Sequence, residues 1–117
     1  MKKIIYLLTC VGATSFFTGC SSPKLLYSWS NYDRTSFTYL KKGDDKSREN
    51  VLKSYQQIIK KQEGTRKTVP PGIYADWGFI LLQTGKIEEG KEMMNKEISL
   101  YPESKVFIEN ILKMFNQ

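Results

Sequence analysis

The sequence predicts an all-α protein, a small bundle of about four to five helices. Apolar residues recur every three or four positions in several stretches of the chain, which is the spacing of one face of an α-helix. Glycine and proline stand at the ends of these stretches, where such residues end one helix or begin the next. At 117 residues, the chain has room for one modest domain with a core, but not for a deep enclosed active site as well.

Residues 1–19 are predicted to be a signal peptide. Lys2 and Lys3 give a short positive start, and the mainly apolar run Ile4–Phe17 follows. A membrane-spanning helix needs around 20 apolar residues to cross a bilayer core of about 30 Å. The run is shorter than that, so it favours a cleaved leader over a transmembrane anchor.

The residues before Cys20 resemble a lipobox, the site at which bacterial lipoproteins are cleaved and acylated. Thr18 and Gly19 fit that pattern, whereas Phe17 takes the place of the usual Leu. The resemblance implies acyl chains on Cys20, which would hold the protein firmly because each buried CH₂ contributes about 0.8 kcal/mol. Ser21 in place of Asp implies sorting to the outer membrane, where the protein would face the periplasm unless a separate export system moves it to the outer surface. The alternative is an ordinary secretory peptide with an accidental cysteine.

After the leader we expect a lipidated tether over residues 20–24 and a helical domain over residues 25–117. Asp33 or Thr35 is expected to cap a short helix that ends at Gly43, because glycine accepts the left-handed conformation at a helix end. The segment around this helix is unusually aromatic, which predicts that its rings dock on the domain or on a partner: Tyr27, Trp29, Tyr32, Phe37 and Tyr39.

The next helix is predicted from about Ser47 to Glu63, with Gly64 ending it. Lys60 and Lys61 suit the negative end of the helix dipole. The apolar face of this helix comprises Val51, Leu52, Tyr55, Ile58 and Ile59.

Two further helices are predicted over about 71–84 and 86–101, joined by a turn at Gly85. Pro71 suits the start of the first helix because proline in a first turn loses no hydrogen bond. Gly78 in the middle of that helix costs roughly 1 kcal/mol relative to alanine, which predicts that it lets the neighbouring helix come close. Helices joined by so short a turn are antiparallel neighbours.

Four residues stand where a tetratricopeptide repeat places its small residues and its closing proline: Gly78, Gly85, Gly90 and Pro102. The two helices thus resemble one degenerate tetratricopeptide-like pair, with Glu97 in place of a second small residue. A single repeat cannot bury its own faces. A last helix after Pro102 is expected to cover the pair with the apolar residues Val106, Phe107, Ile108, Ile111, Leu112 and Phe115.

Four features stand in order along the chain: Tyr27-Ser28-Trp29, the run Pro70–Ala75, Gly85, and Glu97 followed by Tyr101–Ser104. Together they resemble a family of small bacterial lipoproteins of unassigned function. Members of that family look to be encoded beside lipoproteins of the curli-secretion-pore type. The resemblance implies a role in an outer-membrane or envelope assembly, with such a lipoprotein as a possible partner.

Composition argues against an enzyme. The chain has no histidine, and its one cysteine beyond the leader, Cys20, is expected to be acylated. The usual pair of nucleophile and base is therefore missing, and we expect no cofactor. Asp44 and Asp45 lack the spacing of a calcium loop and are interpreted as a solvated turn, so no metal site is expected.

Two hypotheses for function remain open. The first is a membrane-anchored, non-catalytic adaptor that binds protein partners. Its candidate contact residues, each of which fits the core equally well, are Tyr27, Trp29, Tyr32, Tyr74, Asp76 and Trp77.

The second hypothesis is a structural lipoprotein whose basic half contacts anionic lipid or cell-wall polymer. Residues 24–67 contain 11 basic and 5 acidic residues, whereas residues 68–117 contain 5 basic and 7 acidic ones. Nucleic acid is not an expected partner of an exported protein, and a solvated lysine-rich face is the simpler interpretation of the charge. The basic residues in question are Lys41, Lys42, Lys60, Lys61, Arg66 and Lys67.

Overall fold

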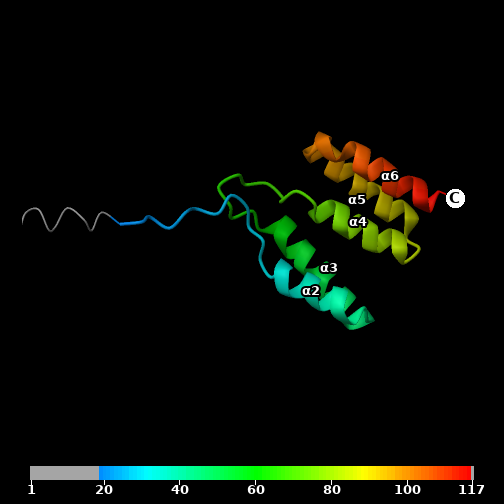
Figure 1. The fold of residues 1–117 in the computed structure, drawn as a ribbon, viewed down its shortest axis with the longest axis horizontal. Coiled ribbons are helices and arrows are strands. Elements are labelled where there is room, and N and C mark those ends of the chain that lie inside the picture. Colours follow the sequence, from blue (N-terminus) through cyan, green and yellow to red (C-terminus); the bar gives the residue numbers. More distant parts are fainter. Residues whose placement is uncertain (1–18, 117) are drawn as a thin grey trace, which may run out of the picture.

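The computed structural model describes residues 19–116, so the predicted signal peptide lies outside the described residues except for Gly19. Over this range the protein has five α-helices, one 3-10 turn and no strand, which confirms the all-α prediction (Figure 1). In chain order the elements are α2 (Tyr32–Lys42), α3 (Asp45–Lys60), α4 (Ile73–Gln83), α5 (Ile87–Leu100), η2 (Pro102–Ser104) and α6 (Lys105–Phe115).

Helix α4 lies at the centre of the bundle, between the α2–α3 pair and the α5–α6 pair (Figure 1). One buried cluster joins α3 to α4 and comprises Val51, Tyr55, Ile58, Val69, Ile73 and Ile80. A second joins α4 to α5 and α6 and comprises Ala75, Leu82, Met94, Ile108 and Ile111. Because α4 supplies side chains to both clusters, it is apolar around most of its circumference, unlike a surface helix with one apolar stripe.

Helices α4 and α5 pack closely, as the glycine spacing predicted. A Cβ atom on Gly78 would lie 2.9 Å from the carbonyl oxygen of Gly90, and a Cβ on Gly90 would lie 2.9 Å from the carbonyl oxygen of Gly78. The two backbones therefore meet where neither residue has a side chain. Gly85 turns the chain between the helices with φ of 81°, in the left-handed region that favours glycine. Pro102 begins η2 after Tyr101, the C-cap residue of α5.

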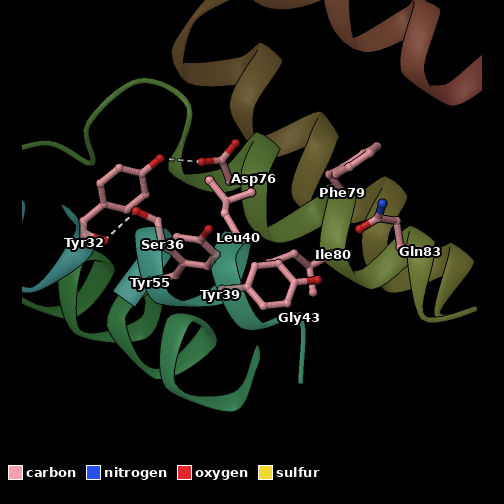
Figure 2. A pocket seen from close by; sticks show the side chains of 10 residues that line it. All are labelled: Tyr32, Ser36, Tyr39, Leu40, Gly43, Tyr55, Asp76, Phe79, Ile80 and Gln83. Atoms are coloured by element: carbon pink, nitrogen blue, oxygen red, sulfur yellow. Dashed lines mark hydrogen bonds between the residues drawn. The ribbon is translucent and has the colours of Figure 1, made fainter. Parts of the chain in front are cut away.

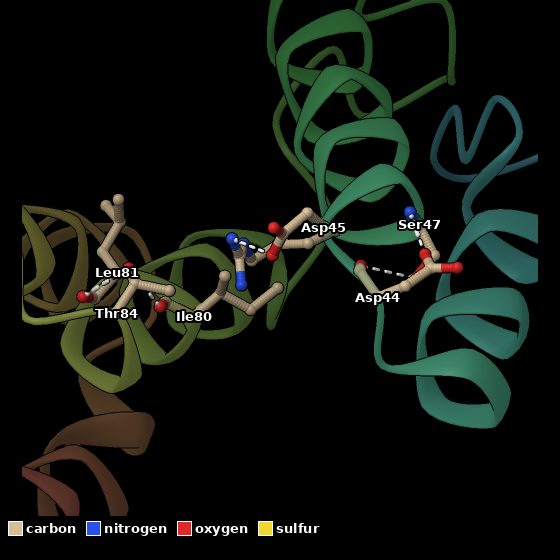
Figure 3. Close-up of polar contacts among 7 residues, drawn as sticks. Asp44, Asp45, Ser47, Ile80, Leu81 and Thr84 are labelled. Carbon is tan, nitrogen blue, oxygen red and sulfur yellow. Dashed lines mark hydrogen bonds and ion pairs between the residues drawn. The ribbon is translucent and has the colours of Figure 1, made fainter.

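The predicted starts of α2 and α3 need correction. Helix α2 begins at Tyr32, before Asp33 and Thr35, which both lie in its first turn. Helix α3 begins at Asp45 because the side chain of Asp44 accepts a hydrogen bond from the backbone N–H of Ser47 at 2.7 Å (Figure 3). Asp44 thus caps the helix, whereas Asp45 forms an ion pair with Arg48 at 2.7 Å, and both aspartates are exposed as the solvated-turn interpretation expected.

Helix α3 ends at Lys60, three residues before the predicted end, and Gly64 does not end it. The side-chain amide of Gln62 folds back and donates to the carbonyl oxygens of Ile58 and Ile59, which satisfies groups left open at the helix end. This closure by a side chain has no simple signature in the sequence.

Gly64 instead allows the N-terminal segment to lie against the loop after α3. The backbone N–H groups of Thr65 and Arg66 donate to the carbonyl oxygens of Leu25 and Leu26, each at 3.0 Å. A Cβ on Gly64 would lie 2.5 Å from the Cα atom of Tyr27. Because Gly64 has no side chain, the backbone of Leu26 and Tyr27 can lie against it, as the backbone of Gly90 lies against Gly78.

Glu97 is buried on α5, with a side chain only 1% exposed. Its Oε1 atom accepts a hydrogen bond from the backbone N–H of Gly72 at 2.7 Å, so the carboxylate caps the first turn of α4. Burial raises the pKa of Glu97, while the backbone N–H groups of Gly72, Ala75 and Tyr74 oppose that rise. Glu97, which takes the place of a small residue of the repeat, thus stabilises the helix pair by joining α5 to the start of α4.

Candidate functional site

A groove of about 550 Å³ lies between α2, α3 and α4 (Figure 2). We call it the α2–α4 groove. Helix α2 lines it with residues that recur at helical spacing and share one face of that helix. The full lining consists of Tyr32, Ser36, Tyr39, Leu40, Gly43, Tyr55, Asp76, Phe79, Ile80 and Gln83.

Asp76 is the one carboxylate in this lining, and Tyr32 holds it in place. The Tyr32 hydroxyl on α2 donates a hydrogen bond to Oδ2 of Asp76 on α4 at 2.7 Å (Figure 2). Burial raises the pKa of Asp76, although the hydrogen bond from Tyr32 opposes that rise. Burial, together with the hydrogen bond to Asp76 and its charge, raises the pKa of Tyr32 to about 12. The groove therefore offers one oriented carboxyl group beside a phenol that is neutral at neutral pH.

Aromatic rings form a continuous row from the N-terminal segment to the floor of the groove. Tyr27 and Trp29 lie with ring centroids 6.3 Å apart, Trp29 and Tyr32 lie 5.5 Å apart, and Tyr32 and Tyr55 lie 6.0 Å apart. Such edge and tilted contacts stabilise aromatic pairs beyond their buried area. The row fixes the segment before α2 onto the domain, which is one of the two outcomes that its aromatic content predicted. Phe37 departs from that prediction, because it is 66% exposed.

The six candidate contact residues do not form one site. Tyr32 and Asp76 meet in the α2–α4 groove. Tyr74 and Trp77 are partly buried and pack against the α3–α4 core. Tyr27 and Trp29 lie with the N-terminal segment, outside the lining of the groove.

Several groove residues were missed from the sequence. Phe79 and Gln83 follow Asp76 at intervals of three and seven positions, so the helical spacing of α4 already placed them on one face. Leu40 also lines the groove and is 82% exposed.

A second, smaller groove lies between α4 and α6, with a volume of about 270 Å³. We call it the α4–α6 groove. It shares Asp76 and Phe79 with the first groove, so the two depressions adjoin along α4. Phe107 and Met114 line it from α6 and are 64% and 62% exposed. Phe107 was predicted to cover the helix pair, and its exposure corrects that prediction, as does the 70% exposure of Val106. Adjacent positions of a helix point in different directions, and Ile108 and Ile111 occupy the buried face.

Cys20, the predicted lipidation site, is exposed and lies in the extended stretch before the domain. Among residues 19–116, no helix is both long and apolar enough to cross a membrane. In the same part of the chain, no three histidine, cysteine, aspartate or glutamate side chains lie together as a metal-binding group.

The fold and the two grooves define a small helical domain with an apolar and aromatic surface around one carboxylate. The model of a family described as a domain of unknown function, DUF4810, matches residues 26–111, so the chain belongs to that family. This agrees with the resemblance to a family of unassigned function. Neither the comparison with curated proteins nor the comparison with solved structures finds a significant match.

Proposed function

We propose that this protein is a lipid-anchored, non-catalytic adaptor of the outer membrane that holds a segment of a protein partner in the α2–α4 groove. The observation that supports this proposal is the groove itself, with Asp76 oriented by Tyr32 among exposed apolar side chains. Apolar clefts with a few fixed polar groups are the usual form of binding sites.

The chemistry of the groove indicates the kind of segment that it fits. Leu40 and Phe79 offer apolar contact, while the Asp76 carboxylate attracts a positive charge. A segment with a lysine or arginine beside apolar residues satisfies both requirements. The family resemblance points to a lipoprotein of the curli-secretion-pore type as the partner that supplies it.

The side chains of the groove do not favour catalysis. The chain contains no histidine, and the described lining residues include neither a cysteine nor a lysine. Asp76 is held by a tyrosine whose pKa of about 12 makes it a poor base at neutral pH. Binding without chemistry is the simpler use of such a surface.

The alternative is a structural lipoprotein whose basic half lies on anionic lipid or cell-wall polymer. That function favours one continuous basic face. Lys41 and Lys42 end α2 beside the start of α3, whereas Lys60 and Lys61 lie at the end of α3. A helix of 16 residues is about 24 Å long, so the two groups lie at opposite ends of the helix. The adaptor is therefore preferred.

Photo-crosslinking in intact cells tests the adaptor. A crosslinking amino acid at Leu40, on the groove rim, is compared with one at Asn95, an exposed position on α5. We expect Leu40 to capture a lipoprotein of the curli-secretion-pore type, Asn95 to capture none, and Asp76→Asn to lower the Leu40 yield several-fold. Capture of lipid or peptidoglycan alone, or equal capture at both positions, would contradict the adaptor.

Cys20→Ala tests the anchor separately. The variant cannot be acylated, so we expect it to leave the membrane fraction, while Ser21→Ala remains there. Mass spectrometry of the retained protein reports the acyl chains directly. Retention of Cys20→Ala in the membrane without acyl label would refute lipid anchoring.

A further inference from the structure

One end of the domain combines exposed apolar side chains with basic ones. It consists of residues 24–29 and residues 60–67, held together by the backbone hydrogen bonds from Thr65 and Arg66 to Leu25 and Leu26. We call this region the tether-end surface, because the chain leaves the domain there toward Cys20 (Figure 1).

The apolar part of the tether-end surface is directed to solvent. Leu25 is 73% exposed, Leu26 is 56% exposed and Trp29 is 37% exposed. The segment is nevertheless fixed, since the missing side chain of Gly64 admits its backbone. Leucine and tryptophan side chains presented in this way suit the boundary between lipid headgroups and acyl chains.

The charged part of the tether-end surface is strongly positive. Its one acidic residue is Glu63, and all its basic side chains are exposed: Lys24, Lys60, Lys61, Arg66 and Lys67. The guanidinium carbon of Arg66 lies 5.8 Å from the centre of the Tyr27 ring, which holds that charge beside the N-terminal segment. Clustered lysine and arginine next to apolar side chains are typical of surfaces that contact anionic lipid.

The length of the tether limits where this surface can lie. Five residue steps separate Cys20 from Leu25, and an extended chain spans at most about 3.6 Å per residue. If acyl chains hold Cys20 in a bilayer, Leu25 lies within about 18 Å of the membrane surface. Lys41 and Lys42 end α2 beside the start of α3, and the length of α3, about 24 Å, separates that point from Lys60.

We propose that the tether-end surface lies on the anionic phospholipid headgroups of the membrane that holds Cys20. This inference rests on the lipid anchor of the proposed function but is independent of what the α2–α4 groove binds. The acyl chains supply attachment, while the basic and apolar side chains set the orientation of the domain. Gly43 and Gln83 line the groove toward the opposite end of α3, so this orientation keeps the groove open to the periplasm.

Fluorescence of Trp29 in reconstituted vesicles tests the orientation. The chain has two tryptophans, so Trp77→Phe in the mature, acylated protein leaves Trp29 as the single reporter. The protein is reconstituted into phosphatidylcholine vesicles, with or without phosphatidylglycerol, that contain a headgroup-level spin-labelled lipid. We expect quenching and a blue shift of Trp29 with phosphatidylglycerol. High salt should weaken both, because it shortens the screening length from about 10 Å at 0.1 M to about 3 Å at 1 M.

Two charge-reversal variants make a matched comparison. Lys60→Glu/Lys61→Glu and Lys41→Glu/Lys42→Glu change the net charge equally, and each alters two exposed lysines at the C-terminal end of a helix. We expect the first pair to abolish the quenching of Trp29 and the second pair to leave it unchanged. Circular dichroism checks that both variants and Trp77→Phe remain helical.

Three results would overturn the proposal. An unquenched Trp29 in acylated protein that floats with the vesicles would assign the surface to a protein or cell-wall partner. Equal loss of quenching in both lysine pairs would show a general charge effect. Absence of acyl chains would remove the anchor and the orientation with it, and mass spectrometry distinguishes this result from the other two.

Discussion

The carboxylate of Glu97 on α5 accepts a hydrogen bond from the backbone N–H of Gly72 at 2.7 Å, at the first turn of α4. The two residues are 25 positions apart in the chain. Gly72 has φ of 95°, a conformation that directs the chain into α4 and that other residues adopt only with strain. An acid from one helix of the pair thus fixes where the other helix begins.

Glu97→Ala is expected to lower the free energy of unfolding by about 2 to 3 kcal/mol, because it removes a buried acceptor and leaves the first N–H groups of α4 unsatisfied. Urea denaturation measures the change. Glu92→Ala on the same helix is the control, since Glu92 is exposed and forms a surface ion pair with Lys96 at 2.8 Å. Such a pair contributes at most about 1 kcal/mol. Equal losses in the two variants would contradict the capping role.

The raised pKa of Glu97 predicts a pH dependence with a definite sign. The folded protein retains this proton at pH values where the unfolded chain has released it. The stability that Glu97 contributes is therefore complete below its ordinary pKa of 4.5 and is lost as the pH rises through its folded-state value. Asp76, whose pKa is also raised, acts in the same direction.

Glu97→Gln isolates this contribution because it removes the titrating group and keeps an acceptor at the same position. Urea denaturation of both proteins from about pH 4 to about pH 8 gives the difference in unfolding free energy, wild type minus variant. That difference should fall as the pH rises. A difference that is constant or grows with pH would show that the folded-state pKa of Glu97 is not raised.

Gly78→Leu is expected to prevent close packing of α4 on α5. A side chain at this position meets the carbonyl oxygen of Gly90 and the backbone nitrogen of Met94, which lie in the rigid backbone of a helix. We expect a loss of at least about 3 kcal/mol and a clearly lower melting temperature in thermal denaturation. Asn95→Leu, an exposed change on α5, should alter stability by no more than about 0.5 kcal/mol. An unchanged melting temperature for Gly78→Leu would refute the close pair.

Gly64→Val is expected to release the N-terminal segment while the helices persist. Its Cβ would displace the backbone of Leu26 and Tyr27, so chymotrypsin should cleave after Trp29 roughly tenfold faster, which corresponds to about 1.4 kcal/mol of lost docking. Gly43→Ala is the control, because a Cβ there meets nothing within 4 Å. That variant strains a left-handed residue but should not speed this cleavage. Equal cleavage rates would show that Gly64 does not hold the segment.

The helices were predictable because their signals are local. Apolar spacing identified five helical stretches, and the glycines that require positive φ, such as Gly43 and Gly85, marked helix ends correctly. Gly78 and Gly90 indicated a close helix contact, because only residues without a side chain allow two helix backbones to approach so closely. The end of α3 was predicted wrongly because Gly64 looks like a helix stop, whereas a side-chain contact from Gln62 closes the helix earlier.

The candidate site was predicted only in part, because its residues come from distant parts of the chain. Tyr32 and Asp76 were both named, but nothing in the sequence indicated that they would meet, since 44 positions separate them. Tyr74 and Trp77 are aromatic residues of the kind that binding surfaces use, yet they are partly buried and pack against the α3–α4 core.

The helices, the turns between them and the division of charge follow from local sequence, because each depends on neighbours within a few residues. The packing of the helices, in contrast, places Glu97 at the start of α4, the backbone of Tyr27 against Gly64, and α2 beside Asp76. These contacts join segments that are brought together by burial of apolar surface. Their identity depends on how the helices pack rather than on the pattern within any one of them.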